Sequence, residues 1–428
     1  MGLHMLLQSS KQSACAILLF SFSAAVLLGA LEVLWLTEVP SNSDYALLLE
    51  DSRLNRFSRH CLADMAIAEE AADQHSADTL HSAIILASHG ETSASHNWPQ
   101  DPRPPSTWDC RPTDLPRHWQ LNRQVHFQAA AENGSALDRS FEPELLRPDL
   151  ARDAGDEDEP WAGRSCAPNQ LTSDGFKQAV RVGRQLAGRY GEALPQAALD
   201  VLSVDTKPSL ATAVGILLPL LAGPASFSTV ADGATVSITT RAGSETLVLL
   251  GGQAVAALED AQSGSDILSR WCNHGTLPCA ADACMTPKAA AELVADGEAR
   301  LCQALSSSSL PIARYLEKAK NRHSGSFSIL SVSGIDITAT LVQLLGREAC
   351  EDVLMARPPW SSVLVLERRL ANGTQPLWKV VWNGLDITQR LSCNKLSDGC
   401  AEHDILNIAK KSLVTAYSQS FASSPSFL

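Results

Sequence analysis

Short apolar runs, separated by longer amphipathic segments, recur along the middle of the chain. Three of them have strand length and an apolar, β-rich composition, and we predict buried strands at Ser82–Ser88, Leu199–Val204 and Ser328–Ser333. Two more apolar runs, Val363–Glu367 and Trp378–Trp382, flank a turn-rich Ala-Asn-Gly sequence and are predicted to pair with each other.

Helical periodicity follows the first strands. Phe176–Tyr190 has an apolar face and a basic outer face, with Phe176, Val180, Gly183, Ala187 and Tyr190 at helical spacing. A buried helix interrupted by Pro219 is predicted over Leu210–Leu221, and a further helix over Ile337–Leu345. Strands that alternate with helices predict an α/β sheet.

Two regions lack this alternation and are expected to be insertions. Residues 93–166 are rich in Pro, Asp and Arg and contain an acidic run, and residues 223–310 are variable with Ala-rich helical stretches. The expected domain therefore covers residues 81–400 and is followed by a C-terminal tail, 401–428.

The N-terminal region predicts a membrane anchor. Ser13–Leu31 carries no charge and is close to the roughly 20 residues that cross a bilayer. Lys11 precedes this run and acidic residues follow it, which favours a cytosolic tail at 1–12, a signal anchor at 13–36 and a lumenal stem at 37–80. A cleaved signal peptide is the alternative, although residues 28–30 form a poor cleavage site.

The cysteines fit a lumenal body. One of the 11, Cys15, lies in the predicted anchor, and an even number remains for disulfide bonds. Cys272, Cys279 and Cys284, with His274 nearby, could instead hold zinc, but their spacing fits no common ligand pattern. We therefore expect disulfides and no metal site.

Charge and sequons extend this interpretation. The net charge of −13 and the lack of long basic clusters argue against nucleic-acid binding. Asn133 and Asn372 each begin an Asn-x-Ser/Thr sequence, which predicts N-glycosylation on a secretory-pathway surface.

The candidate chemistry lies at strand ends. The Ser82–Ser88 strand leads to His89 on a glycine turn, and Asp336 follows the Ser328–Ser333 strand. Reactive groups of open α/β sheets gather at the carboxyl ends of strands. The plainer alternatives are a turn histidine at His89 and a helix N-cap at Asp336, accepting from the amides of Ile337 to Ala339.

Several ordered segments between about residues 80 and 400 resemble the histidine acid phosphatases. Gln170–Gln178 is similar to the Leu-Thr-x-x-Gly-x-x-Gln element of that family, and Trp382–Thr388 to its Tyr-Asn-Gly-Val-Asp-Val-Thr. Pro358–Glu367 resembles its Pro-rich turn and strand. The cysteine trio is similar to one in the 2-phosphoxylose phosphatase branch, which the chain resembles most.

The resemblance implies a phosphoglycerate-mutase-like, three-layer histidine phosphatase fold with a helical insertion. It further implies that His89 is the nucleophile and Asp336 the proton donor, with no cofactor and no metal. The family's Arg-His-Gly-x-Arg is Ser88–Thr92 here, its third phosphate-binding arginine falls on Pro208, and its second histidine falls on Ile335.

Four missing phosphate partners correspond to a loss on the order of 6 to 12 kcal/mol of binding. Lys207 stands beside the place of the third arginine and is a candidate substitute, although an exposed loop lysine is the ordinary alternative. Arg357, Lys177 and Arg181 are further candidates for the same role.

By resemblance, the expected function is phosphomonoester hydrolysis on phosphorylated xylose of the glycosaminoglycan–protein linkage region, by a Golgi type II membrane protein. The expected partners are that phosphorylated glycan or proteoglycan and, through the anchor, the membrane. Two alternatives remain: an inactive pseudophosphatase that binds a glycan, a core protein or a glycosyltransferase, and an unrelated lumenal α/β protein.

Overall fold

The computed structural model describes segments that form an 11-stranded sheet, a separate two-stranded sheet of β6 (Cys279–Ala280) and β7 (Ala283–Cys284), and the helices around them. These are residues 79–93, 110, 126–131, 136–141, 166, 169–190, 198–222, 235–241, 263–272, 277–280, 283–306, 316–317, 320, 326–346, 348–351, 358–371, 375–393, 395–396 and 399–410. The predicted anchor, most of the predicted stem, Arg357 and both sequons, Asn133 and Asn372, lie outside the described residues.

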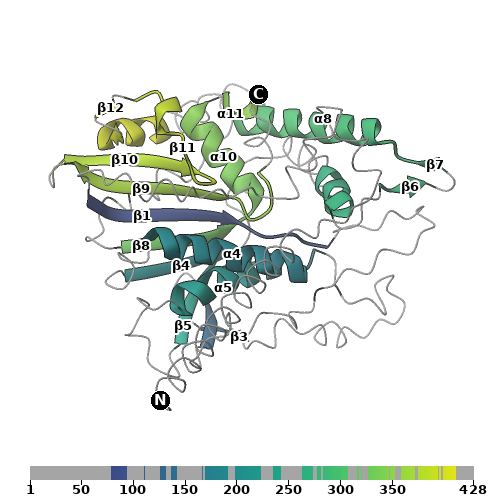
Figure 1. Cartoon of the computed structure of the whole chain (residues 1–428), viewed down its shortest axis with the longest axis horizontal. Coiled ribbons are helices and arrows are strands. Elements are labelled where there is room, and N and C mark those ends of the chain that lie inside the picture. Colours follow the sequence, from purple (N-terminus) through teal and green to yellow (C-terminus); the bar gives the residue numbers. More distant parts are fainter. Residues whose placement is uncertain are drawn as a thin grey trace, which may run out of the picture. The chain divides into compact units, whose positions relative to one another are not determined.

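Five parallel strands form the centre of the sheet. In spatial order they are β1 (Thr79–Ser88), β8 (Ser326–Val332), β4 (Ala198–Val204), β5 (Thr235–Arg241) and β2 (His126–Ala131). Figure 1 shows β1, β8 and β4 side by side. The strands predicted at β1, β4 and β8 are confirmed within three residues at each end.

Antiparallel strands continue the sheet on both sides. Next to β1 lies β9 (Val363–Ala371), paired with β10 (Gln375–Trp382) as predicted. The remaining strands are short or lie at an edge: β3 (Ala136–Phe141), β11 (Leu385–Asp386), β12 (Lys395–Leu396) and β13 (Gly399–Ala401).

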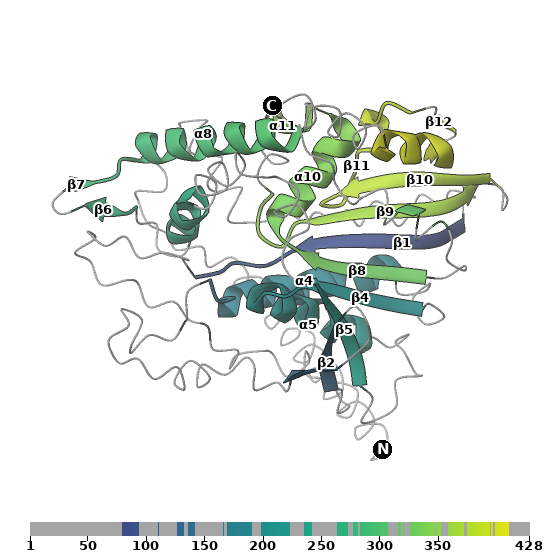
Figure 2. The ribbon, with the colours of Figure 1, turned by 180° about the vertical axis from the view of Figure 1, so that it is seen from behind.

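Helices cover both faces of the sheet (Figures 1 and 2). On one face lie α4 (Ser173–Tyr190) and α5 (Lys207–Ala222), and on the other lie α10 (Gly334–Leu345) and α8 (Pro287–Ser306), with the short α11 (Glu348–Glu351) after α10. The expected mixed α/β architecture with three layers is thus present in the described part of the chain.

The side chains of β1 show why its sequence is continuously apolar. Ile84 and Leu86 belong to the core under α10, whereas Ala83, Ile85 and Ala87 belong to the core under α4 and α5. Because a central parallel strand is buried on both faces, it reads as an unbroken apolar run.

Some expectations about the segments outside the alternating pattern are wrong. The strands β2 and β3 fall within 93–166, and β5 falls within 223–310, so both predicted insertions contribute to the sheet. Residues 402–410 form a helix whose Ile405, Leu406 and Ala409 are buried, so folded structure continues into the predicted tail. Pro219 lies inside α5 and does not interrupt it, because α5 is packed against α4 and the sheet.

The cysteines form disulfides, as predicted. The pairs are Cys110–Cys166, Cys279–Cys284, Cys302–Cys350 and Cys393–Cys400, and Cys272 is also disulfide-bonded. The described residues contain no group of three metal-ligating side chains. None of the helices in this part of the chain is both long enough and apolar enough to cross a membrane.

Candidate active site

The predicted site residues lie at one edge of the sheet. His89 directly follows β1, Asp336 lies in the first turn of α10 after β8, and Lys207 begins α5 after β4. These three strands are neighbours, and their pairing sets Ser88 opposite Val332 and Ser203 opposite Ser331, so they end at the same level. The expectation that His89 and Asp336 share the carboxyl edge is confirmed.

His89 is held in one tautomer. Its Nδ1 lies 2.9 Å from the carbonyl oxygen of Gly90 and must donate to it, because a carbonyl only accepts. Burial lowers the pKa of His89 below 6.5, and the Gly90 carbonyl offsets part of this effect. Burial thus favours the neutral imidazole, whose lone pair lies on Nε2 when Nδ1 donates.

The loop after His89 is packed against the start of α4 through two glycines. A Cβ on Gly90 would lie 2.1 Å from the carbonyl oxygen of Gly175, and one on Gly175 would lie 2.1 Å from that of Glu91. The amide of Glu91 donates to Gln178 Oε1 at 3.0 Å. The two motifs that carry the resemblance are therefore in direct contact.

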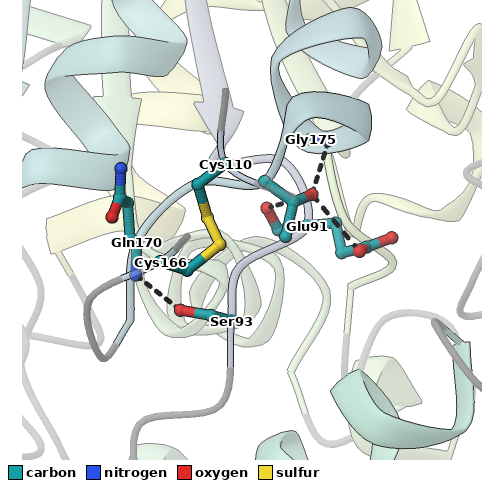
Figure 3. The surroundings of a disulfide bond; sticks show 7 residues. Glu91, Ser93, Cys110, Cys166, Gln170 and Gly175 are labelled. Carbon is teal, nitrogen blue, oxygen red and sulfur yellow. Dashed lines mark hydrogen bonds between the residues drawn. A yellow bond between two sulfur atoms is a disulfide. The ribbon is translucent and has the colours of Figure 1, made fainter. Parts of the chain in front are cut away.

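Thr172 connects the same loop to the helix terminus. Its hydroxyl caps α4 by accepting from the amide of Gly175 at 2.9 Å, and it donates to Glu91 Oε1 at 3.2 Å (Figure 3). Glu91 is buried, so this loop carries a carboxylate two residues after His89.

The first two amides after His89 already have acceptors. The amide of Gly90 donates to Thr212 Oγ1 at 3.4 Å, and the amide of Glu91 donates to Gln178. An anion beside His89 would therefore gain no hydrogen bond from these two N–H groups unless the loop rearranged.

The residues at the places of the arginines belong to the scaffold. Ser88 is 3% exposed, and its hydroxyl lies 3.4 Å from the carbonyl of Pro359. Thr92 is buried and forms a β-bridge with Leu171, and Pro208 is buried in the first turn of α5. None of these side chains can replace a guanidinium.

Asp336 forms part of a capping box. Its Oδ2 accepts from the backbone N–H of Ser333 at 3.0 Å and from the hydroxyl of Ser333 at 2.7 Å, and Ser333 is the N-cap. The alternative of Asp336 as the N-cap itself is therefore wrong in position, because it is the third helical residue, but its capping role is real.

A turn that the sequence did not connect with the site supports His89 from the other side. The amide of Ser361 donates to the His89 carbonyl at 3.0 Å, and the amide of Ser88 donates to the Ser362 carbonyl at 2.9 Å. Ser361 has φ +56°, a left-handed conformation that is uncommon for a residue with a Cβ. Neither Ser361 nor Thr212 was a predicted site residue.

The candidate basic substitutes differ in placement. Lys207 is exposed at the carboxyl edge, Lys177 forms an ion pair with Asp174 at 2.9 Å, and Arg181 is exposed on the outer face of α4. No lysine or arginine in the described segments donates a hydrogen bond to His89. The structure thus brings His89 and Asp336 to one edge, and no guanidinium of the described residues is hydrogen-bonded to His89.

Comparison with known proteins gives fold-level matches alone. No family model and no curated protein matches the sequence. The chain is similar to solved phytases. A Klebsiella phytase is 12% identical with a TM-score of 0.45, over 78% of this chain and 96% of that one.

Two further structures are similar over 78% of this chain. A Hafnia alvei phytase in complex with myo-inositol hexakis sulphate is 11% identical, with a TM-score of 0.43 and 97% of its chain covered. A Bifidobacterium longum multiple inositol polyphosphate phosphatase, in complex with inositol hexasulfate, is 10% identical, with a TM-score of 0.37 and 92% covered.

Proposed function

We propose that this chain is a slow, histidine-dependent phosphomonoesterase of the secretory pathway. The observation that carries the proposal is the placement of His89 at the end of the central strand β1, with Nδ1 donating to the Gly90 carbonyl at 2.9 Å and with burial lowering the imidazole pKa. This arrangement leaves the Nε2 lone pair available as a nucleophile.

In the proposed reaction Nε2 of His89 attacks phosphorus in line and the bond from phosphorus to the ester oxygen breaks. Protonated Asp336 gives its proton to the leaving alkoxide. Water then attacks the phosphohistidine, its proton passes to the Asp336 carboxylate, and inorganic phosphate leaves with His89 restored.

The absence of the arginines sets the expected rate. Stabilisation of the charge on the equatorial oxygens dominates phosphoryl transfer, and Ser88, Thr92 and Pro208 supply none of it. Losses on the order of 6 to 12 kcal/mol would abolish turnover, so measurable activity requires a substitute, for which Lys207 is placed best.

The substrate and compartment are proposed from the sequence and the cysteines. Four disulfides in the described residues support maturation in an oxidising compartment, and the predicted anchor supports a lumenal Golgi location. The spacing of Cys272, Cys279 and Cys284 resembles that of 2-phosphoxylose phosphatases and supports a phosphorylated xylose in a proteoglycan linkage region as the substrate.

A second candidate is a pseudophosphatase that binds the phosphorylated glycan without hydrolysis. Two observations favour it: the two amides after His89 already have acceptors, and Asp336 Oδ2 is engaged by Ser333. Both observations reduce the number of groups that could stabilise the charge of a transition state.

The deciding experiment measures phosphate release by the full chain in detergent. The substrates are a phosphoxylose-bearing linkage saccharide and a small aryl phosphate, between pH 4 and 7. His89→Ala is compared with His403→Ala, a matched histidine change whose side chain is 71% exposed.

Loss of release in His89→Ala, with His403→Ala active, supports the phosphatase, and Lys207→Ala then tests the substitute. No release above the His89→Ala background, with saccharide binding that His89→Ala weakens, supports the second candidate. Neither release nor binding would refute both.

A further inference from the structure

The His89 loop is joined to the segment before α4 by a short antiparallel ladder. Thr92 forms a β-bridge with Leu171, and the amide of Thr172 donates to the carbonyl of Glu91 at 3.0 Å. We call these two segments, residues 91–93 and 170–172, the active-site ladder. The ladder begins immediately after the turn that orients the His89 ring.

Ser93 and Gln170 form two hydrogen bonds at the outer end of this ladder, in which Ser93 is once the donor and once the acceptor. The amide of Ser93 donates to the Gln170 carbonyl at 2.8 Å, and the Gln170 amide donates to Ser93 Oγ at 3.0 Å. Ser93 is 1% exposed, so separation of the two strands would have to let water into a buried position.

A disulfide lies beside this end of the ladder. Figure 3 shows the Cys110–Cys166 bond next to Gln170 and Ser93, with Glu91 on its other side. Both cysteines are 4% exposed and pack against each other in a small cluster of their own. The bond joins positions separated by 56 residues, and both lie within the segment that connects the two ladder strands.

We propose that the Cys110–Cys166 disulfide is a positioning element for His89: it keeps the active-site ladder closed and thereby holds the loop that orients the imidazole. The proposal rests on the proposed function for its effect on rate, but its structural part concerns His89 alone and can be tested without turnover.

The physical reason is the small number of contacts that the ladder itself provides. One bridge and five hydrogen bonds join these two short segments, and such segments open locally at low cost. The disulfide packs beside the ladder and shortens the chain path between its two strands, which then runs only through residues 94–110 and 166–169. Without it, water reaches the loop and the desolvation of His89 is lost.

The chain supplies a matched control. Cys302–Cys350 joins positions separated by 48 residues, a similar length, between α8 and α11, and Cys302 is 5% exposed. The cysteine of α11 follows the end of α10, whereas Asp336 is at its beginning, and both cysteines of this bond pack in the core under α10.

The experiment compares full-length Cys110→Ala/Cys166→Ala with Cys302→Ala/Cys350→Ala. The pKa of the His89 imidazole is read by NMR titration, with His89→Ala used to assign its signal. We expect both variants to lose thermal stability to a similar extent. In the first variant the His89 pKa should rise toward 6.5, and in the control it should stay at the wild-type value.

Where phosphate release is measurable, we expect a tenfold or larger fall in kcat for the first variant and less than a twofold fall for the control. An unchanged His89 pKa in the first variant, or an equal rise in both variants, would refute the proposal. Failure of the proposed function removes only the kcat readout and leaves the titration to decide.

A milder variant keeps the test decisive if the first pair of substitutions prevents folding. Ser93→Ala leaves the Gln170 amide without its acceptor while both disulfide cysteines remain. It should raise the His89 pKa in the same direction, and Ser93→Thr, which retains the hydroxyl, should restore the wild-type value. Failure of threonine to restore it would contradict a role for the ladder.

Discussion

A buried carboxylate at the C-terminal end of α4 provides a test of the interactions that hold this helix against the sheet. Glu367 on β9 is fully buried, and it lies opposite Ala83, six residues before His89 on β1. Its Oε1 accepts from Arg189 at 2.8 Å and from the hydroxyl of Tyr190 at 2.6 Å, and its Oε2 accepts from Arg369 at 2.8 Å.

Glu367→Gln removes the charge and one acceptor with little change in volume. The amide nitrogen of glutamine only donates, so either the Arg369 Nε or the pair from Arg189 and Tyr190 loses its acceptor. Removal of one partner from a buried ion pair costs about 3 to 5 kcal/mol. The side chains of Arg189 and Arg369 keep 18% and 20% exposure and retain some water, so we expect about 3 kcal/mol, the lower end of that range.

This loss should depend on pH in a defined direction. Burial by itself raises the pKa of Glu367, but the charges of Arg369 and Arg189 and the Tyr190 hydrogen bond outweigh it, so the pKa lies below 4.5. Glu367 therefore adds stability that is fully present above pH 4.5 and is lost as pH falls through its folded pKa. The difference between wild type and variant should be constant from pH 5 to 7 and shrink below 4.5.

The assay is urea denaturation followed by fluorescence at several pH values, with Glu317→Gln as the control. Glu317 pairs with Lys410 at 2.6 Å with both side chains about half exposed, and its replacement should leave the midpoint unchanged. Equal stability of Glu367→Gln and wild type at pH 7 would refute this account of the ion pairs of Glu367. So would a stability difference at pH 3.5 as large as the one at pH 7.

Three further predictions concern the site. Gly175→Ala should lower the free energy of unfolding by about 3 kcal/mol or more, because the new Cβ meets the Glu91 carbonyl. Gly188→Ala in the same helix meets nothing within 4 Å and should raise the free energy of unfolding by about 0.5 to 1 kcal/mol. Both changes are measured from urea midpoints. Ser333→Ala should cost about 1 kcal/mol in the same assay through loss of the N-cap. If phosphate is released, the acid limb of kcat/KM should lie below pH 6.5, since burial lowers the pKa of His89, and a limb above 6.5 would contradict this.

The central strands could be predicted because burial on both faces makes their sequences continuously apolar, as in β1 and β8. The strand β2 escaped prediction because its sequence, His-Phe-Gln-Ala-Ala-Ala, is rich in alanine, which has little preference for strands. In β5 polar residues occupy most positions, and among its described side chains Ile238 alone is fully buried.

Some residues of the site could likewise be predicted from the sequence, and others could not. His89 and Asp336 could be placed from the sequence because each follows a recognisable strand, and strand ends converge in an α/β sheet. Thr212 and Ser361 could not, because their bonds to the His89 loop join residues 122 and 272 positions apart. A single sequence carries no signal that connects positions so distant.

The residues that join the His89 loop to α4 affect the stability of the fold, whereas residues that would bind a phosphate do not. This difference bears on function. Gly90, Gly175 and Gln178 join the His89 loop to α4, so their replacement costs stability whether or not the protein is an enzyme. Arginines that bind a phosphate are not needed to hold these elements together. The presence of the two glycines and the glutamine therefore says little about catalysis.

His89 is different, because its burial works against stability at acidic pH. A histidine with a lowered pKa must stay neutral in the native state while the unfolded chain takes up a proton, so stability falls as pH drops below 6.5. An apolar residue at this position would avoid that cost and keep the packing. The imidazole is therefore better explained by a reaction or a ligand at Nε2 than by the needs of the fold.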